Sequence, residues 1–174
     1  MSLFEDKELV IFDLDGTLVK TQFLHEKAYS LAKDWIWQQN SKNSDKDLLY
    51  KMKCRFYLDL LTSSELELNL PVYNLYQLLK STNKKLALAT STLEVNAYAI
   101  IEKLGLDFDL VLTGDQFKNN NKPAPDMFLK ACEHFKIGIY NTIVIEDSEN
   151  GFMAAKAANI SYIDANNLEC QNLL

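Results

Sequence analysis

Leu9-Val10-Ile11-Phe12-Asp13-Leu14-Asp15-Gly16-Thr17-Leu18 is the stretch that decides the fold of this chain. Its apolar first half is typical of a buried strand in a parallel sheet, and Gly16 then allows a backbone turn that other residues resist. Ligands of open α/β sheets bind just outside the carboxyl ends of the strands. Asp13 and Asp15 therefore lie where chemistry is expected, and as residues two apart they point the same way if the chain stays extended. Two close carboxylates need a divalent cation between them or a proton on one of them.

Composition restricts the kind of protein this is. The chain has 174 residues, of which 48% are hydrophobic, and a formal net charge of −6. This length allows one domain with a substantial core and a small insertion. The acidic balance argues against nucleic acid as a partner, because binding a phosphate backbone needs a basic surface. A small anionic substrate needs only local positive charge.

Cysteine usage and hydropathy indicate the compartment. The three cysteines show no metal-ligand spacing, and their odd number does not suggest a disulfide framework. No apolar run approaches the roughly 20 residues that span a bilayer, and no signal peptide is visible. We therefore expect a cytoplasmic protein without a membrane partner.

The pattern after the first strand predicts a helical insertion over residues 20–70, followed by alternating helices and strands. The insertion carries two apolar stripes at helical spacing, formed by Leu24, Ala28, Leu31 and Trp35 and by Leu49, Met52, Phe56 and Leu60. Apolar strands are predicted over residues 85–90, 110–113, 142–147 and 160–163. Together these elements predict an α/β fold with a doubly wound parallel sheet and a helical hairpin inserted after its first strand.

Polar side chains collect at the carboxyl ends of the predicted strands and in one loop. Besides Asp13 and Asp15, they are Thr90, Ser91, Thr92, Lys122, Glu146 and Asp147. Acidic groups bind Mg²⁺ through oxygen, and a carboxylate can attack phosphorus. Hydroxyls, backbone N–H groups and a lysine can hold phosphoryl oxygens while charge moves. The set therefore favours phosphoryl transfer.

Four segments of the chain resemble, in order, the four signature motifs of the haloacid dehalogenase superfamily. They are Asp13-Leu14-Asp15-Gly16-Thr17, Thr90, Lys122-Pro123-Ala124-Pro125-Asp126 and Glu146-Asp147-Ser148. The resemblance covers nearly the whole chain and is closest to the phosphoglycolate-phosphatase and β-phosphoglucomutase branch. It implies a Rossmann-like catalytic core formed by residues 1–19 and 71–174, with residues 20–70 as a small all-helical cap domain.

The resemblance also implies the catalytic roles. Asp13 would be the nucleophile that forms an aspartyl-phosphate, and Asp15 would protonate the leaving oxygen and then deprotonate the attacking water. Lys122 would offset charge between Asp13 and the phosphoryl group. An acid at Asp15 fits a phosphatase or a phosphomutase, since the leaving oxygen of a phosphoester must be protonated.

Metal and phosphate sites follow from the same resemblance. Mg²⁺ would be held by Asp13, the main-chain carbonyl of Asp15 and Asp147, with help from Glu146. The phosphate would be held by Thr90, Ser91 and Lys122. The expected activity is Mg²⁺-dependent hydrolysis of a small phosphorylated metabolite, such as a sugar phosphate, phosphoglycolate or a nucleotide. We expect a monomer or a weak dimer.

Two other functions and two other residues stay open. His25 lies ten residues after Asp15 and could assist proton transfer in a sugar phosphomutase, or it could simply be packed or solvated. A non-enzymatic phospho-aspartate switch is disfavoured because Asp13 precedes the second acidic pair. Arg55 is the only arginine in the chain. It could bind a substrate carboxylate or a second phosphate, or pair with Asp59 on a solvated face.

Overall fold

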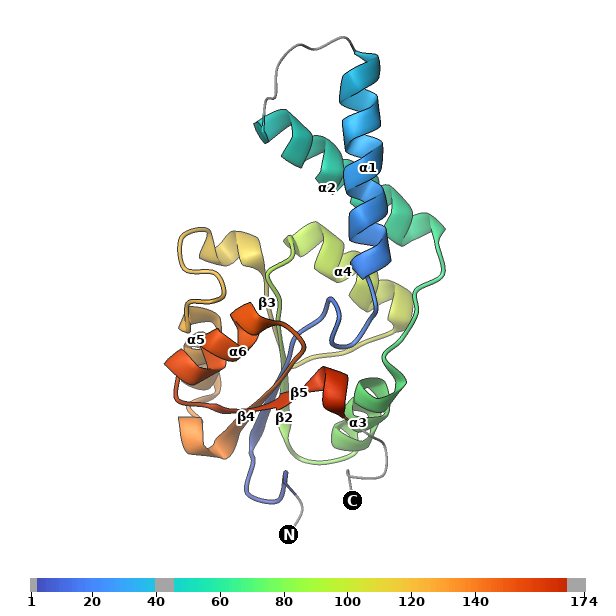
Figure 1. Cartoon of the computed structure of the whole chain (residues 1–174). Helices are drawn as coiled ribbons and strands as arrows, with labels where there is room; N and C mark the ends of the chain where they lie inside the picture. The colour runs from blue at the N-terminus through green and yellow to red at the C-terminus, as the bar shows by residue number, and fades with distance from the viewer. Residues whose placement is uncertain (1–2, 40–45, 169–174) are drawn as a thin grey trace.

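A single five-stranded parallel sheet forms the centre of the molecule (Figure 1). The computed structural model describes residues 3–39 and 46–168. The strand order is β3-β2-β1-β4-β5, so the strand that carries the first motif is central. The strands are β1 (Leu9–Phe12), β2 (Lys85–Ala89), β3 (Leu110–Leu112), β4 (Thr142–Glu146) and β5 (Ser161–Asp164). In register, Leu9 lies beside both Lys85 and Thr142, which aligns the carboxyl ends of β1, β2 and β4.

Helices cover both faces of this sheet, as the doubly wound prediction required. They are α3 (Leu70–Lys80), α4 (Glu94–Leu104), α5 (Asp126–Phe135) and α6 (Glu149–Ala157), with short 3-10 turns at Gly114–Phe117, Ile139–Asn141 and Ala165–Asn167. Because strand side chains alternate, Val10 and Phe12 pack in one apolar cluster with α3 and α4. Leu9 and Ile11 pack in the other with α5 and α6. The predicted α/β fold class is confirmed.

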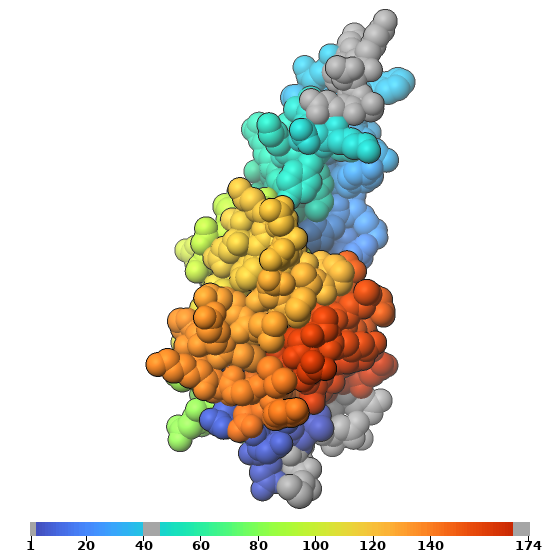
Figure 2. Space-filling model, turned by 90° about the vertical axis from the view of Figure 1, so that its left-hand side faces the viewer, coloured from blue at the N-terminus to red at the C-terminus, as the bar shows by residue number. Residues whose placement is uncertain are grey.

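The helical insertion stands beyond the carboxyl ends of the strands as a two-helix hairpin (Figures 1 and 2). It consists of α1 (Gln22–Gln38) and α2 (Lys46–Ser63). Its two connections to the core lie side by side, since Val19 forms an antiparallel bridge with Leu68. The division into residues 1–19 with 71–174 and residues 20–70 stays a prediction, but this bridge places both crossings at one point.

The buried faces of the hairpin differ in detail from the predicted stripes. On α1 the buried residues are Leu24, Ala28 and Ala32, so Leu31 and Trp35 lie at the margin. On α2 they are Tyr57, Leu60 and Leu61. The buried face of α2 is therefore displaced from the predicted stripe, because this short hairpin must contact α4 as well as α1.

Lys103 of α4 ties the end of α2 to the core. Its ammonium donates to the main-chain oxygens of Leu61, Thr62 and Ser64. Leu61 and Thr62 belong to the last turn of α2 and Ser64 directly follows it, so the ammonium lies where a cation is favourable to the helix dipole.

We expect Lys103→Met to lower the free energy of unfolding by about 1–2 kcal/mol, since three acceptors lose a charged donor. Amide hydrogen exchange in the last turn of α2 should become faster. Lys130→Met is the control, because Lys130 makes an exposed pair with Glu133 that contributes about 0–1 kcal/mol. Equal effects of the two substitutions on unfolding and exchange would contradict the role of Lys103.

Within residues 3–39 and 46–168, none of the helices combines the length and apolar character that crossing a bilayer requires. The cytoplasmic location, the absence of a nucleic-acid partner and the monomeric or weakly dimeric state stay predictions.

Candidate active site

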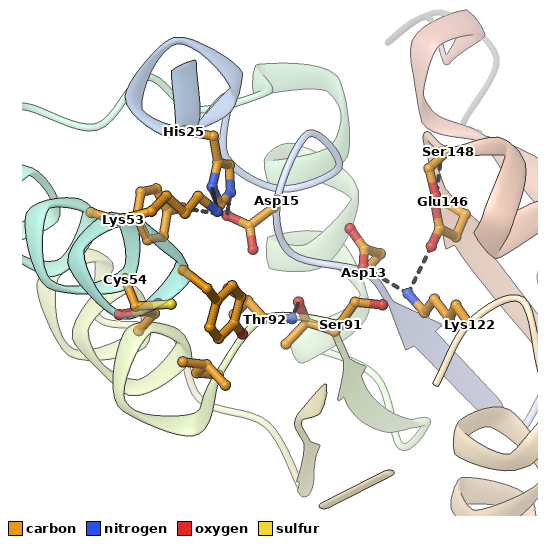
Figure 3. A pocket seen from close by; sticks show the side chains of 15 residues that line it. Asp13, Asp15, His25, Lys53, Cys54, Ser91, Thr92, Lys122, Glu146 and Ser148 are labelled. Carbon is orange, nitrogen blue, oxygen red and sulfur yellow. Dashed lines mark hydrogen bonds and ion pairs between the residues drawn. The ribbon is translucent and has the colours of Figure 1, made fainter. Parts of the chain in front are cut away.

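A cavity of about 320 Å³ lies where the carboxyl ends of the central strands face the helical hairpin (Figure 3). The core contributes Asp13, Asp15, Thr90, Ser91, Thr92, Leu93, Asn96, Lys122, Glu146 and Ser148. The hairpin contributes His25, Tyr50, Lys53, Cys54 and Tyr57. Most of the predicted site residues thus meet in one place. Asp147 and Arg55 are not part of the cavity wall.

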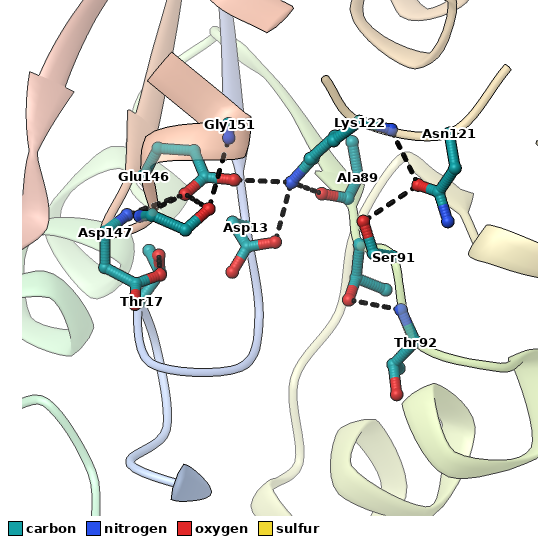
Figure 4. Close-up of polar contacts among 12 residues, drawn as sticks. Asp13, Thr17, Ala89, Ser91, Thr92, Asn121, Lys122, Glu146, Asp147 and Gly151 are labelled. Carbon is teal, nitrogen blue, oxygen red and sulfur yellow. Dashed lines mark hydrogen bonds and ion pairs between the residues drawn. The ribbon is translucent and has the colours of Figure 1, made fainter. Parts of the chain in front are cut away.

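Lys122 joins two of the predicted carboxylates at the buried end of this cavity (Figure 4). Its ammonium lies 2.7 Å from Asp13 Oδ1 and 2.7 Å from Glu146 Oε1, and it donates to the Ala89 carbonyl at 2.8 Å. All three charged side chains are buried. Burial alone would lower the pKa of Lys122, but the two carboxylates outweigh it and raise that pKa. The lysine is therefore a fixed positive charge beside Asp13.

The same burial acts on Asp13 in the opposite sense. Burial raises the pKa of the Asp13 carboxyl well above its usual range, Glu146 and Asp147 add to this, and Lys122 opposes it. A nucleophilic carboxylate must be ionised. A divalent cation among these acidic groups would favour the ionised form.

Glu146 uses both carboxylate oxygens inside the protein. Besides the Lys122 ion pair at Oε1, its Oε2 accepts from the backbone N–H groups of Asp147 at 2.7 Å and Ser148 at 2.8 Å. Gly151 leaves room for it, because a Cβ there would lie 1.9 Å from Glu146 Oε1. Glu146 therefore positions Lys122 and the turn after β4.

Three carboxylates form a cluster that fits a hard divalent cation. Oxygen atoms of Asp13, Glu146 and Asp147 lie within 4.8 Å of one another. Asp147 is oriented by Thr17, whose hydroxyl donates to Oδ1 at 2.7 Å. An all-oxygen set of this kind suits Mg²⁺. Since Glu146 is occupied by Lys122 and the backbone, Asp13 and Asp147 are the better direct ligands.

Gly16 provides the space for Asp147. Its φ of +90° is unfavourable for other residues, and a Cβ there would lie 2.1 Å from Asp147 Oδ2. We expect Gly16→Ala to destabilise the fold by about 1–3 kcal/mol and to raise the Mg²⁺ concentration needed for half-maximal activity. Denaturant unfolding and a Mg²⁺ titration of activity measure these effects.

The matched control for that substitution is Gly138→Ala, because no atom lies within 4 Å of a Cβ at Gly138. It should change stability by about 0.5 kcal/mol or less. An unchanged Mg²⁺ requirement in Gly16→Ala would show that Asp147 does not depend on this glycine.

Asp15 faces the hairpin and has a different set of partners from Asp13. Its Oδ1 accepts from Thr21 Oγ1 at 2.6 Å and Tyr57 OH at 2.7 Å, and lies 3.5 Å from His25 Nε2. β1 ends at Phe12, so the extended alternation that would align the two aspartates does not continue to Asp15. The two carboxylates share the cavity but not their contacts.

These contacts set the charge of Asp15. Burial alone would raise the pKa of Asp15, but hydrogen bonds from His25, Thr21 and Tyr57 outweigh it, so the pKa is lowered. Burial and the Asp15 charge in turn raise the pKa of Tyr57, which stays a hydrogen-bond donor. In the ligand-free protein Asp15 is therefore an ionised base.

His25 is held between two side chains of α2. Its ring stacks on Tyr57 with centroids 3.9 Å apart and an interplanar angle of 12°. Lys53 Nζ lies 3.0 Å from His25 Nδ1. Since an ammonium can only donate, Nδ1 accepts, and a neutral ring then carries its proton on Nε2, toward Asp15.

The loop after β2 forms the wall beside Lys122. Thr90 is buried, and its hydroxyl accepts from the Thr92 N–H at 3.1 Å. Ser91 Oγ donates to Asn121 Oδ1 at 2.8 Å, and the same oxygen accepts from the Lys122 N–H. Asn121 thus couples the two loops (Figure 4). Phosphate binding by Thr90, Ser91 and Lys122 stays a prediction.

Among the site residues that sequence reasoning missed are the side chains that surround Asp15 and His25, namely Thr21, Lys53 and Tyr57. The available signal was spacing, because Thr21 and His25, like Lys53 and Tyr57, lie four residues apart on one helical face. Arg55 lies on the exposed side of α2 and forms no ion pair within the described part of the chain.

Comparison with known proteins agrees with this architecture. Residues 30–165, more than half of the chain, match the sequence model of the haloacid dehalogenase-like hydrolase family. The chain therefore belongs to this family of hydrolases. Its relatives include named phosphatases and a β-phosphoglucomutase-like structure.

Two curated relatives and one solved structure illustrate the similarity. The chain is 32% identical to the phosphorylated carbohydrates phosphatase of Thermotoga maritima, over 90% of this chain and 83% of the relative. It is 28% identical to fructose-1-phosphate phosphatase YqaB of Escherichia coli, over 93% and 98% respectively. The fold matches CbbY from Rhodobacter sphaeroides in complex with phosphate, with a TM-score of 0.79 at 23% identity, covering 91% of this chain and 85% of CbbY.

Proposed function

We propose that this protein is a Mg²⁺-dependent phosphatase that hydrolyses a small phosphorylated metabolite through an aspartyl-phosphate at Asp13. The observation that carries the proposal is the buried contact of Lys122 with Asp13 and Glu146, 2.7 Å from each. A lysine held there can offset the charge of a carboxylate and a phosphoryl group brought together. Glu146 fixes the lysine without competing for the phosphoryl group.

The first chemical step uses both aspartates. Asp13 attacks phosphorus, the bond between phosphorus and the leaving oxygen breaks, and Asp15 gives that oxygen a proton. Asp15 acquires this proton when the phosphate enters, because a nearby negative charge raises a carboxyl pKa. The proton comes from solvent, because a neutral His25, whose Nε2 lies 3.5 Å from Asp15, can donate a hydrogen bond to the carboxylate but cannot supply its proton.

The second step releases phosphate. Asp15, again ionised, takes a proton from water, which attacks phosphorus and breaks its bond to Asp13. The hydrogen bonds from His25, Thr21 and Tyr57 outweigh burial and keep Asp15 ionised, so that it is free to accept this proton. Mg²⁺ held by Asp13 and Asp147 would supply positive charge to the phosphoryl oxygens in both steps.

Sugar phosphates are the proposed substrate class. The Thermotoga relative is named for phosphorylated carbohydrates and the Escherichia relative for fructose 1-phosphate. The cavity agrees, since hydroxyl, amide and charged groups line its wall beside a few apolar side chains. A sugar offers hydroxyl groups for such contacts.

The test is phosphate release from a panel of sugar phosphates, phosphoglycolate and nucleotides, with Mg²⁺ and with EDTA. We expect release from at least one sugar phosphate, and its loss in EDTA. Undiminished release in EDTA would contradict the Mg²⁺ requirement, and release from nucleotides alone would contradict the substrate class.

A sugar phosphomutase is the second candidate, and the contact between His25 and Asp15 is the observation that favours it. A mutase returns the phosphoryl group to a sugar instead of water. Conversion of glucose 1-phosphate to glucose 6-phosphate without phosphate release would select this candidate. Rapid hydrolysis of the phosphorylated enzyme would reject it.

A further inference from the structure

The cavity contains two lysines, and they lie at opposite ends with Asp15 between them (Figure 3). Lys122 is fully engaged by Asp13 and Glu146. Lys53 lies 3.0 Å from His25 Nδ1 and 5.5 Å from the Tyr57 ring centre. Across the described parts of the chain, no carboxylate lies within ion-pair distance of Lys53.

Lys53 differs from the exposed lysines without an ion pair, such as Lys51, because it is partly buried and lines the cavity. The chain has 24 acidic residues against 18 basic ones, and the acidic residues of the cavity wall are all committed elsewhere. Asp13 and Glu146 contact Lys122, and Asp15 accepts from Thr21 and Tyr57. An ammonium has three donors, and His25 accounts for one of those of Lys53.

The proposed reaction fixes the direction of the substrate. The transferred phosphoryl group lies against Asp13 and Lys122, and Asp15 meets the leaving oxygen. The rest of the leaving group then extends past Asp15 toward α2, where Lys53 enters the cavity. This argument rests on the proposed function.

We propose that Lys53 binds a second anionic group on the leaving group, either a carboxylate or a phosphate. The preferred substrates are then phosphate esters that carry two anionic groups. Asn96 of α4 also lines the cavity, and its buried Oδ1, which has no hydrogen-bond partner in the described part of the chain, is an acceptor for a substrate hydroxyl and not for the anion. Arg55, which the sequence suggested for this role, lies outside the cavity wall.

The alternative is that Lys53 only positions His25 for its contact with Asp15. The two roles differ in what they do to different ligands. Loss of a positioning residue changes the binding of all phosphate esters to the same extent. Loss of an anion-binding residue weakens only the esters with a second charge.

The experiment is calorimetric binding with Mg²⁺ in an Asp13→Asn background, which does not depend on turnover. One pair of ligands is 2-phosphoglycolate and 2-hydroxyethyl phosphate, which tests a carboxylate. The other is fructose 1,6-bisphosphate and fructose 1-phosphate, which tests a second phosphate. We expect the doubly anionic member of at least one pair to bind about tenfold more tightly. Lys53→Met should reduce this preference to about twofold or less.

Two further variants keep the result interpretable. Lys51→Met removes an exposed lysine of the same helix, outside the cavity wall, and should keep the preference. Lys53→Arg retains the charge and should keep most of it, which also guards against misfolding of the methionine variant. No preference in either pair, a preference that survives in Lys53→Met, or equal weakening of both members would overturn the proposal. Failure of phosphate release in the wild type would instead count against the proposed function.

Discussion

Lys122→Met is expected to lower the free energy of unfolding by about 3–5 kcal/mol and to abolish phosphate release. The substitution removes the common partner of Asp13 and Glu146, which are 6% and 1% exposed. Breaking a buried ion pair by removing one member leaves an uncompensated charge in the interior. Urea denaturation of the wild type and the variant measures the loss.

The pH dependence of this deficit gives a second readout. Burial already raises the pKa of Asp13, and without the lysine this pKa rises further. The folded variant then binds more protons than its unfolded chain, so its stability falls as pH rises between about 5 and 8. The deficit relative to the wild type should therefore grow over that range.

Lys20→Met is the control for this prediction, because Lys20 pairs with Glu67 at the surface. It should cost about 1 kcal/mol or less. A similar cost for Lys122→Met would show that the buried contact does not hold the site together.

Asp13→Asn is expected to reduce phosphate release by about 10⁴-fold or more while the fold survives. An amide oxygen can still accept from Lys122, but it is not a nucleophile toward phosphorus. The residual rate should be the one that substrate binding and positioning provide without the nucleophile. Steady-state phosphate release, with a thermal unfolding curve for each protein, makes the measurement.

The matched substitution is Asp6→Asn, an exposed aspartate whose partner is Lys7. It should leave the rate unchanged. If Asp13→Asn retained more than about a hundredth of the wild-type rate, Asp13 would not be the nucleophile.

Much of the fold and half of the site could be predicted from the sequence. The strands are apolar runs, and their buried faces follow the period of two, as Val10 and Phe12 against Leu9 and Ile11 show. Parallel strands bring their carboxyl ends to one edge, which is why Asp13 and Glu146 could be placed together. Lys122 lies in a loop, and the resemblance of its segment to a family motif implied its place beside them.

The hairpin side of the site could not be predicted in the same way. The helical period locates the apolar face of α2 but not the angle at which α2 crosses α1 and α4. This crossing angle determines which α2 side chains, here Lys53 and Tyr57, face Asp15 and His25. The difference appears at Trp35, which the predicted apolar stripe of α1 included but which is only partly buried. It also appears at Arg55, two residues from Lys53 on the opposite side of α2.

The most direct test of the central claim is to stop the reaction of the wild-type protein with a hydrolysed substrate in acid and map the phosphorylated peptide. The account predicts a peptide spanning Asp13 that is heavier by one phosphoryl group, loses it on treatment with hydroxylamine, and is absent from Asp13→Asn. Turnover with no phosphorylated peptide, or with the label on another residue, would contradict the assignment of Asp13 as the nucleophile.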